Sequence, residues 1–548
     1  MKTAFIHGNV ITVDPAFGRT EAFLVDGESF STVGSTEEIL KEVKIAEEKG
    51  EGPVSIVDLE GKTVLPGFND SHLHLLNYAY GLSKYDCSRA SSIEEMVDQC
   101  RAYIEEKKIP AGSWVSGRGW NQVFLKENRP PRKEDLDRIS TEHPIVFTRV
   151  CEHMVVANSK ALEVAGITEL SKNPEGGEIE KDESGHLTGM LKETARYLIY
   201  RIIPPKTVDE IKDMLEEAIK TASSFGVTSA QTDDFETFSD KDWRKVLKAY
   251  KELIDEGRMN IRVYEQCLLP QIDRLKEFLK EGNVTGKGDT YFKIGPLKLL
   301  TDGSLGGRTA YLSKPYADAP DRRGIPVFTR EELDELIITA HKAGMQLVCH
   351  GIGDGAMNMI IDSFEKAQKV LPKEDARPGI IHVQITDLPL IRRFKEQKVL
   401  AYLEPVCLNS DLHIARERVG EELEKTSYNY RTFCDMGIRT PMSSDCPVDS
   451  LNPFDSMYVG VNRVDYKGFP EGGYMPEQKL TVEQMIKGFT IDGAYASFEE
   501  DKKGSIETGK YADFIIVSAD PLKVPNLSLR QIQVEETYLG GRRIYKKA

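Results

Sequence analysis

The chain has 548 residues, more than one ordinary domain, so we expect a large core domain with appended parts. Hydrophobic residues make up 40% and charged residues 29% of it, which is the composition of a soluble globular protein. Its formal net charge of −16 argues against a nucleic-acid or anionic-membrane partner, since both require a basic surface.

The first residues and the cysteines predict a cytoplasmic protein. The start, MKTAFIHGNVITVD, contains no apolar segment typical of a signal peptide, and no apolar run is long enough to cross a bilayer. The eight cysteines are scattered without a C-x-x-C pair, as expected for free thiols in a reducing compartment. We therefore expect no membrane partner.

Both ends of the chain are predicted to form short strands joined by turns. In residues 1–60, AFIHGNVITVD and EAFLVDGESFSTVG alternate apolar and polar residues around Gly and Asp turns. Residues 501–548 contain a similar pattern in KGSIETGKYADFIIVSAD. Because chain termini often lie close together in space, we expect the two segments to pair into one small β-sandwich.

Between these ends, residues 61–500 alternate strands with helices. Helices with a 3.6-residue periodicity are predicted, for example, over 207–226 and 329–344. The predicted strands are 64–76, 227–234, 261–269, 291–302, 345–354, 379–387, 399–406 and 437–445. Eight such units predict a (β/α)₈ TIM barrel of the α/β class, whose chemistry lies at the carboxyl ends of the strands.

One long block, residues 80–205, follows the first strand and does not fit the alternation. It contains an amphipathic helix (SSIEEMVDQCRAYIEEKK), the segment GRGWNQVFLKENRPPRKEDLD and a strand (IVFTRVCEHMVVANSKAL). Loops after barrel strands face the active site, so we expect a folded insertion that acts as a lid or substrate wall.

The first predicted strand, VLPGFNDSHLHLL, carries an H-x-H pair. Because every second side chain of a strand points the same way, His72 and His74 are expected to share one face. Two imidazoles at the end of a buried strand can bind a metal ion together. The alternative is one core histidine beside one surface histidine, so the interpretation depends on further ligands elsewhere.

Lys298 lies within an apolar predicted strand, in KLLTDG. A buried lysine usually needs a partner or a function. One interpretation is an ion pair with Asp302 or another carboxylate. The other is an amine that has reacted with carbon dioxide to a carbamate, whose two anionic oxygens can bridge two metal ions.

Two histidines and an aspartate are found at the ends of later strands. His350 ends the fifth strand, His382 lies on the sixth, and Asp445 ends the eighth. Each has an ordinary alternative, as a hydrogen-bonded core histidine or a helix N-cap. Since all would point where His72 and His74 point, together they favour a metal site, with Asp445 as both ligand and proton carrier.

The insertion and one barrel loop contain further candidates. His153 could reach the substrate from the insertion, and Trp120 and Asn121 could line the pocket, although Trp120 fits equally well in a subdomain core. The GSLGGRTA loop after Asp302 could present backbone N–H groups and Arg308 to a polar or anionic substrate group. A flexible Gly-rich connection is the alternative for this loop.

With these residues in order, the chain resembles the amidohydrolase superfamily of metal-dependent hydrolases. Within it, the chain is similar to the branch of N-substituted formamide deformylases and YtcJ-like amidohydrolases. The resemblance covers nearly the whole chain and rests on eight features in the right order. These are PGFNDSHLH, GRGWNQ, CEHMVVANSKAL, KLLTDGSLGGRTA, CHGIGD, the strand-six histidine, SSDCPV and GSIETGKYADFIIV.

The resemblance implies a metal centre and its ligands. The implied ligands are His72 and His74 for one ion, His350 and His382 for a second, a carboxylated Lys298 that bridges the two, and Asp445. One or two zinc ions are expected, because zinc accepts mixed nitrogen and oxygen ligands, and manganese or iron would also be tolerated.

Two positions depart from the family pattern. Ile381 stands where a Glu commonly precedes the strand-six histidine, and Glu404 precedes Pro405 where the family commonly has Gln. Neither is expected to touch an implied ligand, but both could change the pocket. The residues expected to bind substrate are Trp120, Asn121, Asp302, Arg308 and Glu404.

The expected reaction is hydrolysis of a non-peptide C–N bond of a small molecule, in an amide, an N-formyl group or a cyclic amide. The metal would activate water, and a donor such as His153 would help to stabilise the oxyanion. Asp445 would act first as general base and then as general acid.

Two alternatives stay open at this point. The same centre could act on an ester, a lactone, a phosphoester or an amidine, because this metal chemistry transfers readily between electrophiles. The chain could also be a non-catalytic binding protein on the same scaffold, which would predict the loss of ligands. A homodimer is an open expectation for the assembly.

Overall fold

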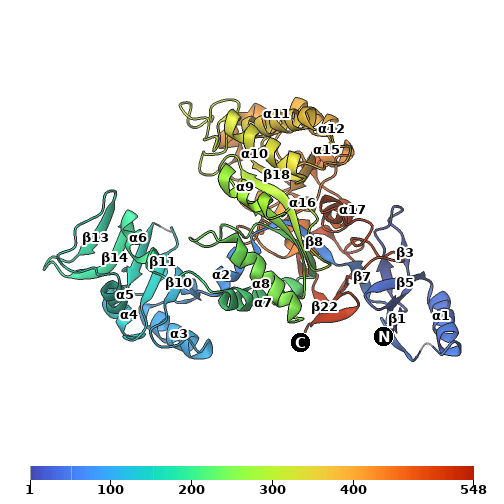
Figure 1. The fold of residues 1–548 in the computed structure, drawn as a ribbon, viewed down its shortest axis with the longest axis horizontal. Coiled ribbons are helices and arrows are strands. Elements are labelled where there is room, and N and C mark those ends of the chain that lie inside the picture. Colours follow the sequence, from blue (N-terminus) through green and yellow to red (C-terminus); the bar gives the residue numbers. More distant parts are fainter. Residues whose placement is uncertain (1, 51, 152) are drawn as a thin grey trace. The chain divides into compact units, whose positions relative to one another are not determined.

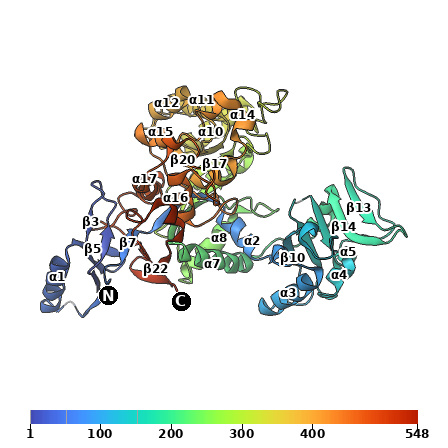
Figure 2. The ribbon, with the colours of Figure 1, turned by 180° about the vertical axis from the view of Figure 1, so that it is seen from behind.

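The computed structural model describes residues 2–50, 52–151 and 153–548, which form two compact units. The first unit contains the residues up to Tyr78 together with Val208–Ala548, and the second contains Ala79–Thr207. Figures 1 and 2 show the ribbon from opposite sides. In the sequence, the residues of the second unit separate the two segments of the first, so the second unit is an insertion in the larger one.

A seven-stranded parallel sheet forms the centre of the first unit. Its strands, in spatial order, are β8 (Phe68–Leu73), β15 (Val227–Thr232), β16 (Arg262–Leu268), β17 (Phe292–Leu300), β18 (Leu347–Gly351), β19 (Gly379–His382) and β20 (Leu400–Leu403). Nearly all of these residues are buried, as expected for parallel strands covered on both faces.

The gap between β20 and β8 is bridged by residues 439–445, which belong to the eighth predicted strand, 437–445. Met442 forms a parallel bridge with Leu403, and its carbonyl accepts a hydrogen bond from Ser71 N. Asp445 N donates to His72 O at 3.0 Å. The segment is too irregular to be a regular strand, and Pro441 removes one backbone donor from it. The nearly closed parallel sheet is that of a TIM-barrel-like domain, which confirms the predicted α/β class.

Helices follow the strands, and α10 (Arg330–Ala343) shows why they form where they do. Thr329 and Glu332 make reciprocal side-chain to backbone hydrogen bonds at its start, a capping box. Gly344 ends it with a left-handed φ of 99°, which glycine adopts without strain. Its buried residues, at helical spacing, are Leu333, Leu336, Ile337, Ala340 and His341.

Further helices of this unit follow the central strands in the chain, and several of them are labelled in Figure 1. Between the strands lie α7 (Val208–Ser224), α8 (Trp243–Asp255), α9 (Ile272–Lys280), α10 (Arg330–Ala343), α11 (Asp354–Val370) and α12 (Leu388–Glu396). After β20 lie α13 (Leu408–Asp411), α14 (Ala415–Glu424), α15 (Tyr430–Asp435), α16 (Pro453–Asn462), α17 (Val482–Gly488) and α18 (Ile491–Ala496).

The two ends of the chain meet in two further sheets. One has the order β5 (Ser29–Gly34), β4 (Ala22–Asp26), β1 (Lys2–Ile6), β6 (Val54–Asp58), with α1 (Thr36–Glu48) beside it. The other has the order β23 (Arg542–Lys546), β22 (Val534–Leu539), β21 (Phe514–Val517), β7 (Thr63–Pro66), β2 (Asn9–Ile11), β3 (Arg19–Thr20). Aromatic side chains of both sheets share one core, for example Phe5, Phe23, Phe514 and Tyr538.

The predicted first strand, 64–76, is divided between a terminal sheet and the barrel. Val64 pairs with Ile516 in the terminal sheet, whereas the barrel strand begins at Phe68. Gly67 lies between them, and a Cβ there would overlap the side chain of Thr228. The glycine therefore lets the chain pass from one sheet into the next at close range.

The second unit is built on a six-stranded mixed sheet. Its order is β13 (Gly177–Lys181), β14 (Leu187–Glu193), β12 (Met154–Ala157), β11 (Ile145–Arg149), β10 (Val115–Trp120), β9 (Tyr85–Asp86). Helices α3 (Ile93–Glu106), α4 (Lys133–Asp137) and α5 (Ser159–Val164) belong to the same unit. The stretch 145–162, predicted as one strand, forms the antiparallel pair β11 and β12 followed by α5.

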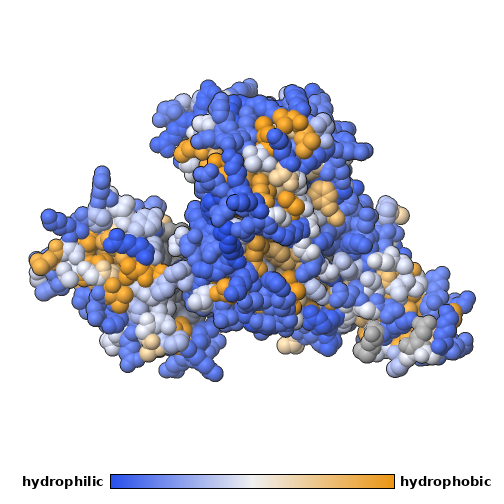
Figure 3. Space-filling model, viewed as in Figure 1, coloured by the Kyte–Doolittle hydropathy of each residue, from blue (hydrophilic) through white to orange (hydrophobic). Residues whose placement is uncertain are grey.

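No helix in the described part of the chain is both long and apolar enough to cross a membrane. The face shown in Figure 3 is largely hydrophilic, with hydrophobic side chains scattered in small areas. All eight cysteines are free thiols.

Candidate metal centre

The predicted ligands lie at the carboxyl ends of the central strands. His72 is near the end of β8, His382 ends β19, and Asp445 follows the irregular segment that closes the sheet. Asp445 (φ 54°) and His382 (φ 77°) both have left-handed backbone conformations that are unfavourable for non-glycine residues. Such strain accumulates where function requires a particular geometry.

One group of three side chains surrounds the carboxylate of Asp445. His74 Nε2 lies 3.0 Å and His72 Nε2 3.4 Å from Asp445 Oδ1. Potential ligand atoms of the three residues all lie within 4.8 Å of one another. Two imidazole nitrogens and a carboxylate oxygen at this spacing are a donor set that suits a divalent transition metal.

The imidazoles of this centre are held by hydrogen bonds at their Nδ1 atoms. His72 Nδ1 lies 2.8 Å from Gln266 Oε1, and His74 Nδ1 contacts Asp233 Oδ1. Metal-binding histidines are typically held by such partners, which fix the ring orientation and leave the other nitrogen free to bind. Both Nε2 atoms point to Asp445 as a result.

A second group shares Asp445 and continues around the barrel. His382, Glu404 and Asp445 offer ligand atoms within 4.8 Å of one another. His382 Nδ1 lies 2.5 Å from Glu404 Oε2, and the His382 ring is 4.4 Å from the ring of His350 and 5.9 Å from that of His72. The four predicted histidine ligands therefore form one continuous cluster. The expectation that Glu404 touches no ligand is wrong, because its side chain contacts His382 directly.

Lys298 is fully buried beside these groups. Its Nζ lies 3.3 Å from His72 Nε2 and 3.9 Å from Asp233 Oδ2. The carboxylate of its ion pair is therefore Asp233 rather than Asp302. Burial lowers the pKa of the Lys298 amine, although Asp233 and Asp445 oppose this shift.

Burial also determines the protonation of the histidines. It lowers the pKa of His72 and of His382 well below the usual value, with further lowering by neighbouring positive charge. Neutral imidazole is the form that binds a metal. Burial opposes the charge on His74 as well, but Asp233 and Asp445 raise the pKa of His74 to about 10. A cation at Asp445 would compete with that proton.

Unsatisfied carboxylate oxygens show that the residues present fit a divalent ion. Asp233 Oδ2 and Glu404 Oε1 are shielded from solvent and have no hydrogen-bond partner among the described residues. Burial raises the pKa of Asp70, whose carboxyl lies beside Ser444 N, to about 7. Buried carboxylates without partners are costly, and a bound cation would satisfy them.

Two predicted substrate residues of the barrel are engaged in loop contacts. Asp302 accepts hydrogen bonds from the backbone N–H groups of Tyr311 and Gly353 at 2.9 Å, and His350 Nε2 lies 3.2 Å from its Oδ1. Arg308 forms an ion pair with Asp318 at 2.6 Å. Asp302 thus fixes both its own loop and the ring of His350.

The remaining predicted residues belong to the second unit. Trp120 is buried in its core and donates from Nε1 to Phe147 O at 3.0 Å, which is the packing role that the sequence left open. Asn121 caps a short 3₁₀ helix through Val123 N. His153 is exposed, and its Nδ1 lies 3.0 Å from Glu193 Oε2.

Asp233 and Gln266 are contacts of this centre that the sequence analysis missed. Asp233 follows β15, and Gln266 lies within β16. The stretch VTSAQTDD was predicted as a strand ending in two acidic residues, and that ending was the available signal.

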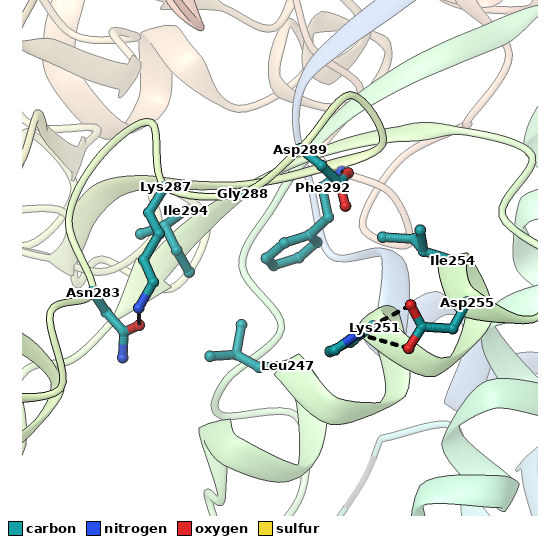
Figure 4. Close-up of a pocket in the computed structure, with 10 residues that line it drawn as sticks. All are labelled: Leu247, Lys251, Ile254, Asp255, Asn283, Lys287, Gly288, Asp289, Phe292 and Ile294. Atoms are coloured by element: carbon teal, nitrogen blue, oxygen red, sulfur yellow. Dashed lines mark hydrogen bonds and ion pairs between the residues drawn. The ribbon is translucent and has the colours of Figure 1, made fainter.

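A separate cavity of about 330 Å³ lies at the opposite end of the strands (Figure 4). It lies between α8 and the start of β17 and is lined in part by Leu247, Phe292 and the Lys251–Asp255 ion pair. Phe292 is six residues from Lys298 along β17, which corresponds to roughly 20 Å. The cavity is therefore distinct from the metal centre.

Comparison with known proteins assigns the family. Residues 55–545 match the model of the amidohydrolase family. The chain is 30% identical over 548 residues to the putative amidohydrolase YtcJ of Bacillus subtilis (strain 168), and the match covers all of both chains. It is 26% identical to the N-substituted formamide deformylase of Arthrobacter pascens, over 99% of this chain and 98% of that protein.

A solved structure agrees with these matches. An uncharacterised metal-dependent hydrolase from Pyrococcus furiosus superimposes with a TM-score of 0.78 at 30% identity, covering 95% of this chain and 100% of that one. The chain therefore belongs to the amidohydrolase family. This confirms the predicted resemblance and the expectation of a metal-dependent hydrolase that acts on carbon–nitrogen bonds other than peptide bonds.

Proposed function

We propose that the chain uses this centre to hydrolyse a non-peptide C–N bond of a small molecule, in an amide, an N-formyl compound or a cyclic amide. The observation that carries the proposal is the convergence of His72, His74 and Asp445, with His382 beside them, from strands far apart in sequence. The likeness to an N-substituted formamide deformylase supports an N-formyl substrate.

The donor set favours zinc, as one or two ions. His72, His74 and Asp445 would hold one ion, and His350 and His382 would hold a second. When bound, the ion lowers the pKa of water towards neutrality and polarises a carbonyl group.

Lys298 is the proposed bridge between the two ions, in its carboxylated form. Its lowered pKa increases the fraction of neutral amine, the form whose lone pair can add to carbon dioxide. The addition forms an N–C bond, releases one proton and leaves two anionic oxygens beside His72. A neutral buried amine thereby becomes an anionic ligand.

Asp445 is the proposed proton carrier. Although burial opposes it, the hydrogen bond with His74 and the positive charges of His74 and Lys298 hold the pKa of Asp445 below its usual value. The carboxylate accepts the proton that the attacking water loses and then passes it to the leaving nitrogen. The C–N bond breaks as that nitrogen is protonated, which gives an acid and an amine.

His153 is the proposed donor to the developing oxyanion. Asn121 is a proposed substrate-wall residue, which Trp120 would support from the core of its unit. Arg308 would contact a polar substrate group from its loop. A cytoplasmic location and a homodimer stay predictions.

Metal analysis combined with a substrate panel tests the function. The panel contains N-substituted formamides, cyclic amides, esters, lactones, phosphoesters and amidines. We expect a zinc-containing protein that hydrolyses one of the C–N substrates, loses activity with a chelator and regains it with zinc. Turnover of only esters, lactones, phosphoesters or amidines would favour the alternative chemistry. A chain without a divalent ion would favour a binding protein.

A further inference from the structure

Glu404 belongs to the second group of candidate ligands, which shares Asp445 with the first group. It follows β20, so it lies between His382 at the end of β19 and the segment that carries Asp445. Its side chain is 2% exposed. One oxygen, Oε2, lies 2.5 Å from His382 Nδ1, whereas Oε1 is buried without a hydrogen-bond partner among the described residues.

We propose that Glu404 is a metal ligand of this chain, and that Asp445 is shared by two adjacent subsites. His72 and His74 also belong to the first subsite, and Glu404 joins His382 and His350 in the second. This inference rests on the proposed function, because it concerns the ions on which that function depends. It gives Glu404 a role other than substrate binding.

Charge is the first argument for a ligand. Glu404 and Asp445 place carboxylate oxygens within 4.8 Å of each other and of a His382 nitrogen, and both residues are buried. Two ionised carboxylates at this distance are unfavourable in the interior, which screens charge poorly, so both can carry their charge together only with a cation beside them. A divalent cation bound between them would compensate both charges and would satisfy Glu404 Oε1.

The chemical identity of the residue is the second argument. A glutamine at this position would be neutral, and its amide oxygen could hold His382 equally well by accepting a hydrogen bond from Nδ1. A glutamate adds a negative charge, which is costly to bury and does nothing more for ring orientation. The added charge is useful only if a cation is present.

A glutamine substitution separates the two roles of Glu404. In Glu404→Gln the amide oxygen can still accept the hydrogen bond from His382 Nδ1, so ring orientation is kept while the anionic ligand is lost. Glu404→Asp keeps the charge on a shorter side chain. A matched control is Glu265→Gln, because Glu265 is also fully buried with one unpartnered oxygen, yet belongs to neither ligand group.

The experiment measures zinc content and zinc affinity of the purified full-length chain. We expect about two ions per chain in the wild type and in Glu265→Gln, as in two-metal hydrolases. We expect about one ion in Glu404→Gln, or a second ion bound more than about 100-fold more weakly, beyond the ~10–100-fold effect of losing an orienting partner. Glu404→Asp should recover part of this loss.

Cobalt substitution supplies a readout that does not depend on activity. The visible absorption of the second cobalt ion should change or disappear in Glu404→Gln and stay unchanged in Glu265→Gln. Circular dichroism of each variant checks the fold.

The outcomes distinguish the two proposals. If Glu404→Gln binds both ions within tenfold of the wild type, Glu404 only orients His382 and the inference is wrong, while the proposed function stands. A wild type that binds a single ion also overturns the shared site. A wild type that binds no ion overturns the proposed function itself.

Discussion

The two ends of the barrel strands both contain buried charge, but they differ in how it is paired. At the amino ends, Arg262 at the start of β16 contacts both oxygens of Asp513, at 2.7 and 2.9 Å. Close by, Lys293 and Lys503 contact Glu499 at 2.6 and 2.7 Å. Each buried carboxylate here has a cation supplied by the chain.

At the carboxyl ends, buried carboxylates outnumber the lysines and arginines beside them. Asp233, Glu404 and Asp445 lie around the histidine cluster, and Lys298 is the basic side chain among them. Oxygens of Asp233 and Glu404 have no hydrogen-bond partner among the described residues. The comparison indicates that the buried carboxylates at the amino ends are neutralised by lysine and arginine side chains. Those at the carboxyl ends are only partly neutralised, as expected for a site that binds a cation.

The largest expected effect comes from Asp445. Asp445→Asn keeps a ligand oxygen but removes the proton acceptor, so kcat should fall by roughly 10²–10⁴-fold, as is usual when general acid–base catalysis is lost. Zinc analysis should show that much of the metal stays bound. Steady-state kinetics with the substrate identified by the panel measures kcat.

This prediction also tests the contrast between the two ends. Glu499→Gln, at the amino ends, should leave kcat of the folded protein close to the wild-type value. An Asp445→Asn variant that turns over at the wild-type rate would remove Asp445 from the proton transfer.

The next effect concerns stability at the amino ends. Asp513→Ala leaves the buried guanidinium of Arg262 without its partner, and breaking a buried pair in this way costs about 3–5 kcal/mol. Chemical denaturation of the zinc-loaded protein should show this loss. Zinc content should not change, because the pair lies at the other end of the strands.

Replacing both partners gives the control for that variant. Arg262→Met combined with Asp513→Ala removes the isolated charge and should recover part of the lost stability. If Asp513→Ala alone lowered zinc content in the folded state, the two ends would be coupled and the contrast would fail.

Metal removal should lower the stability of the protein because the carboxylates at the carboxyl ends of the strands lose their cation. The ion pairs at the amino ends should not contribute to this loss. A ligand at 100 times its dissociation constant stabilises the folded state by about 2.7 kcal/mol, so for a chain of this length a chelator should lower the Tm of the wild type by about 2 °C per ion removed. Glu499→Gln should show the same chelator-dependent shift. An unchanged Tm of a zinc-loaded wild type on chelation would contradict the idea that a cation completes this end.

The order of the barrel strands and the ligand positions at their carboxyl ends were predictable from the sequence. Alternation within β8 placed His72 on the inner face, and the sequence of strands brought His382 and Asp445 to the same end. These features depend on local pattern and on the rule that parallel strands present their carboxyl ends together.

The contacts of Asp233 and Gln266 were not predictable in the same way. Register shifts interrupt β15 between Ala230 and Thr232 and β16 between Glu265 and Cys267. A bulge changes which side of the sheet the following residues face. The alternation of the sequence therefore does not predict which side chains beyond the bulge point into the barrel.

The acidic pair that ends VTSAQTDD illustrates the consequence. Asp233 contacts His74, whereas its neighbour Asp234 accepts a hydrogen bond from Tyr250 at 2.5 Å. Both residues are aspartate at the end of one strand, and only the three-dimensional register separates the functional residue from the structural one.

The smallest expected effect is the pH dependence contributed by Glu499. Although burial opposes it, Lys503 and Lys293 lower the pKa of Glu499 from 4.5 to about 2. A carboxyl with a depressed pKa in the folded state adds stability that is fully present above its unfolded pKa and is lost as pH falls through the folded value. Because burial also lowers the pKa of Lys503, the net contribution near neutral pH is expected to be only about 1–2 kcal/mol.

Denaturation of the wild type and of Glu499→Gln at a series of pH values measures this contribution. The difference in unfolding free energy should be largest above about pH 5 and should narrow as pH falls towards 2, since the wild-type carboxylate is then protonated as well. A difference that stays constant over this range would show that Glu499 acts by packing alone. At neutral pH Glu499→Gln should bind as much zinc as the wild type, because the carboxylate that it removes is paired with Lys293 and Lys503 and not with the ion.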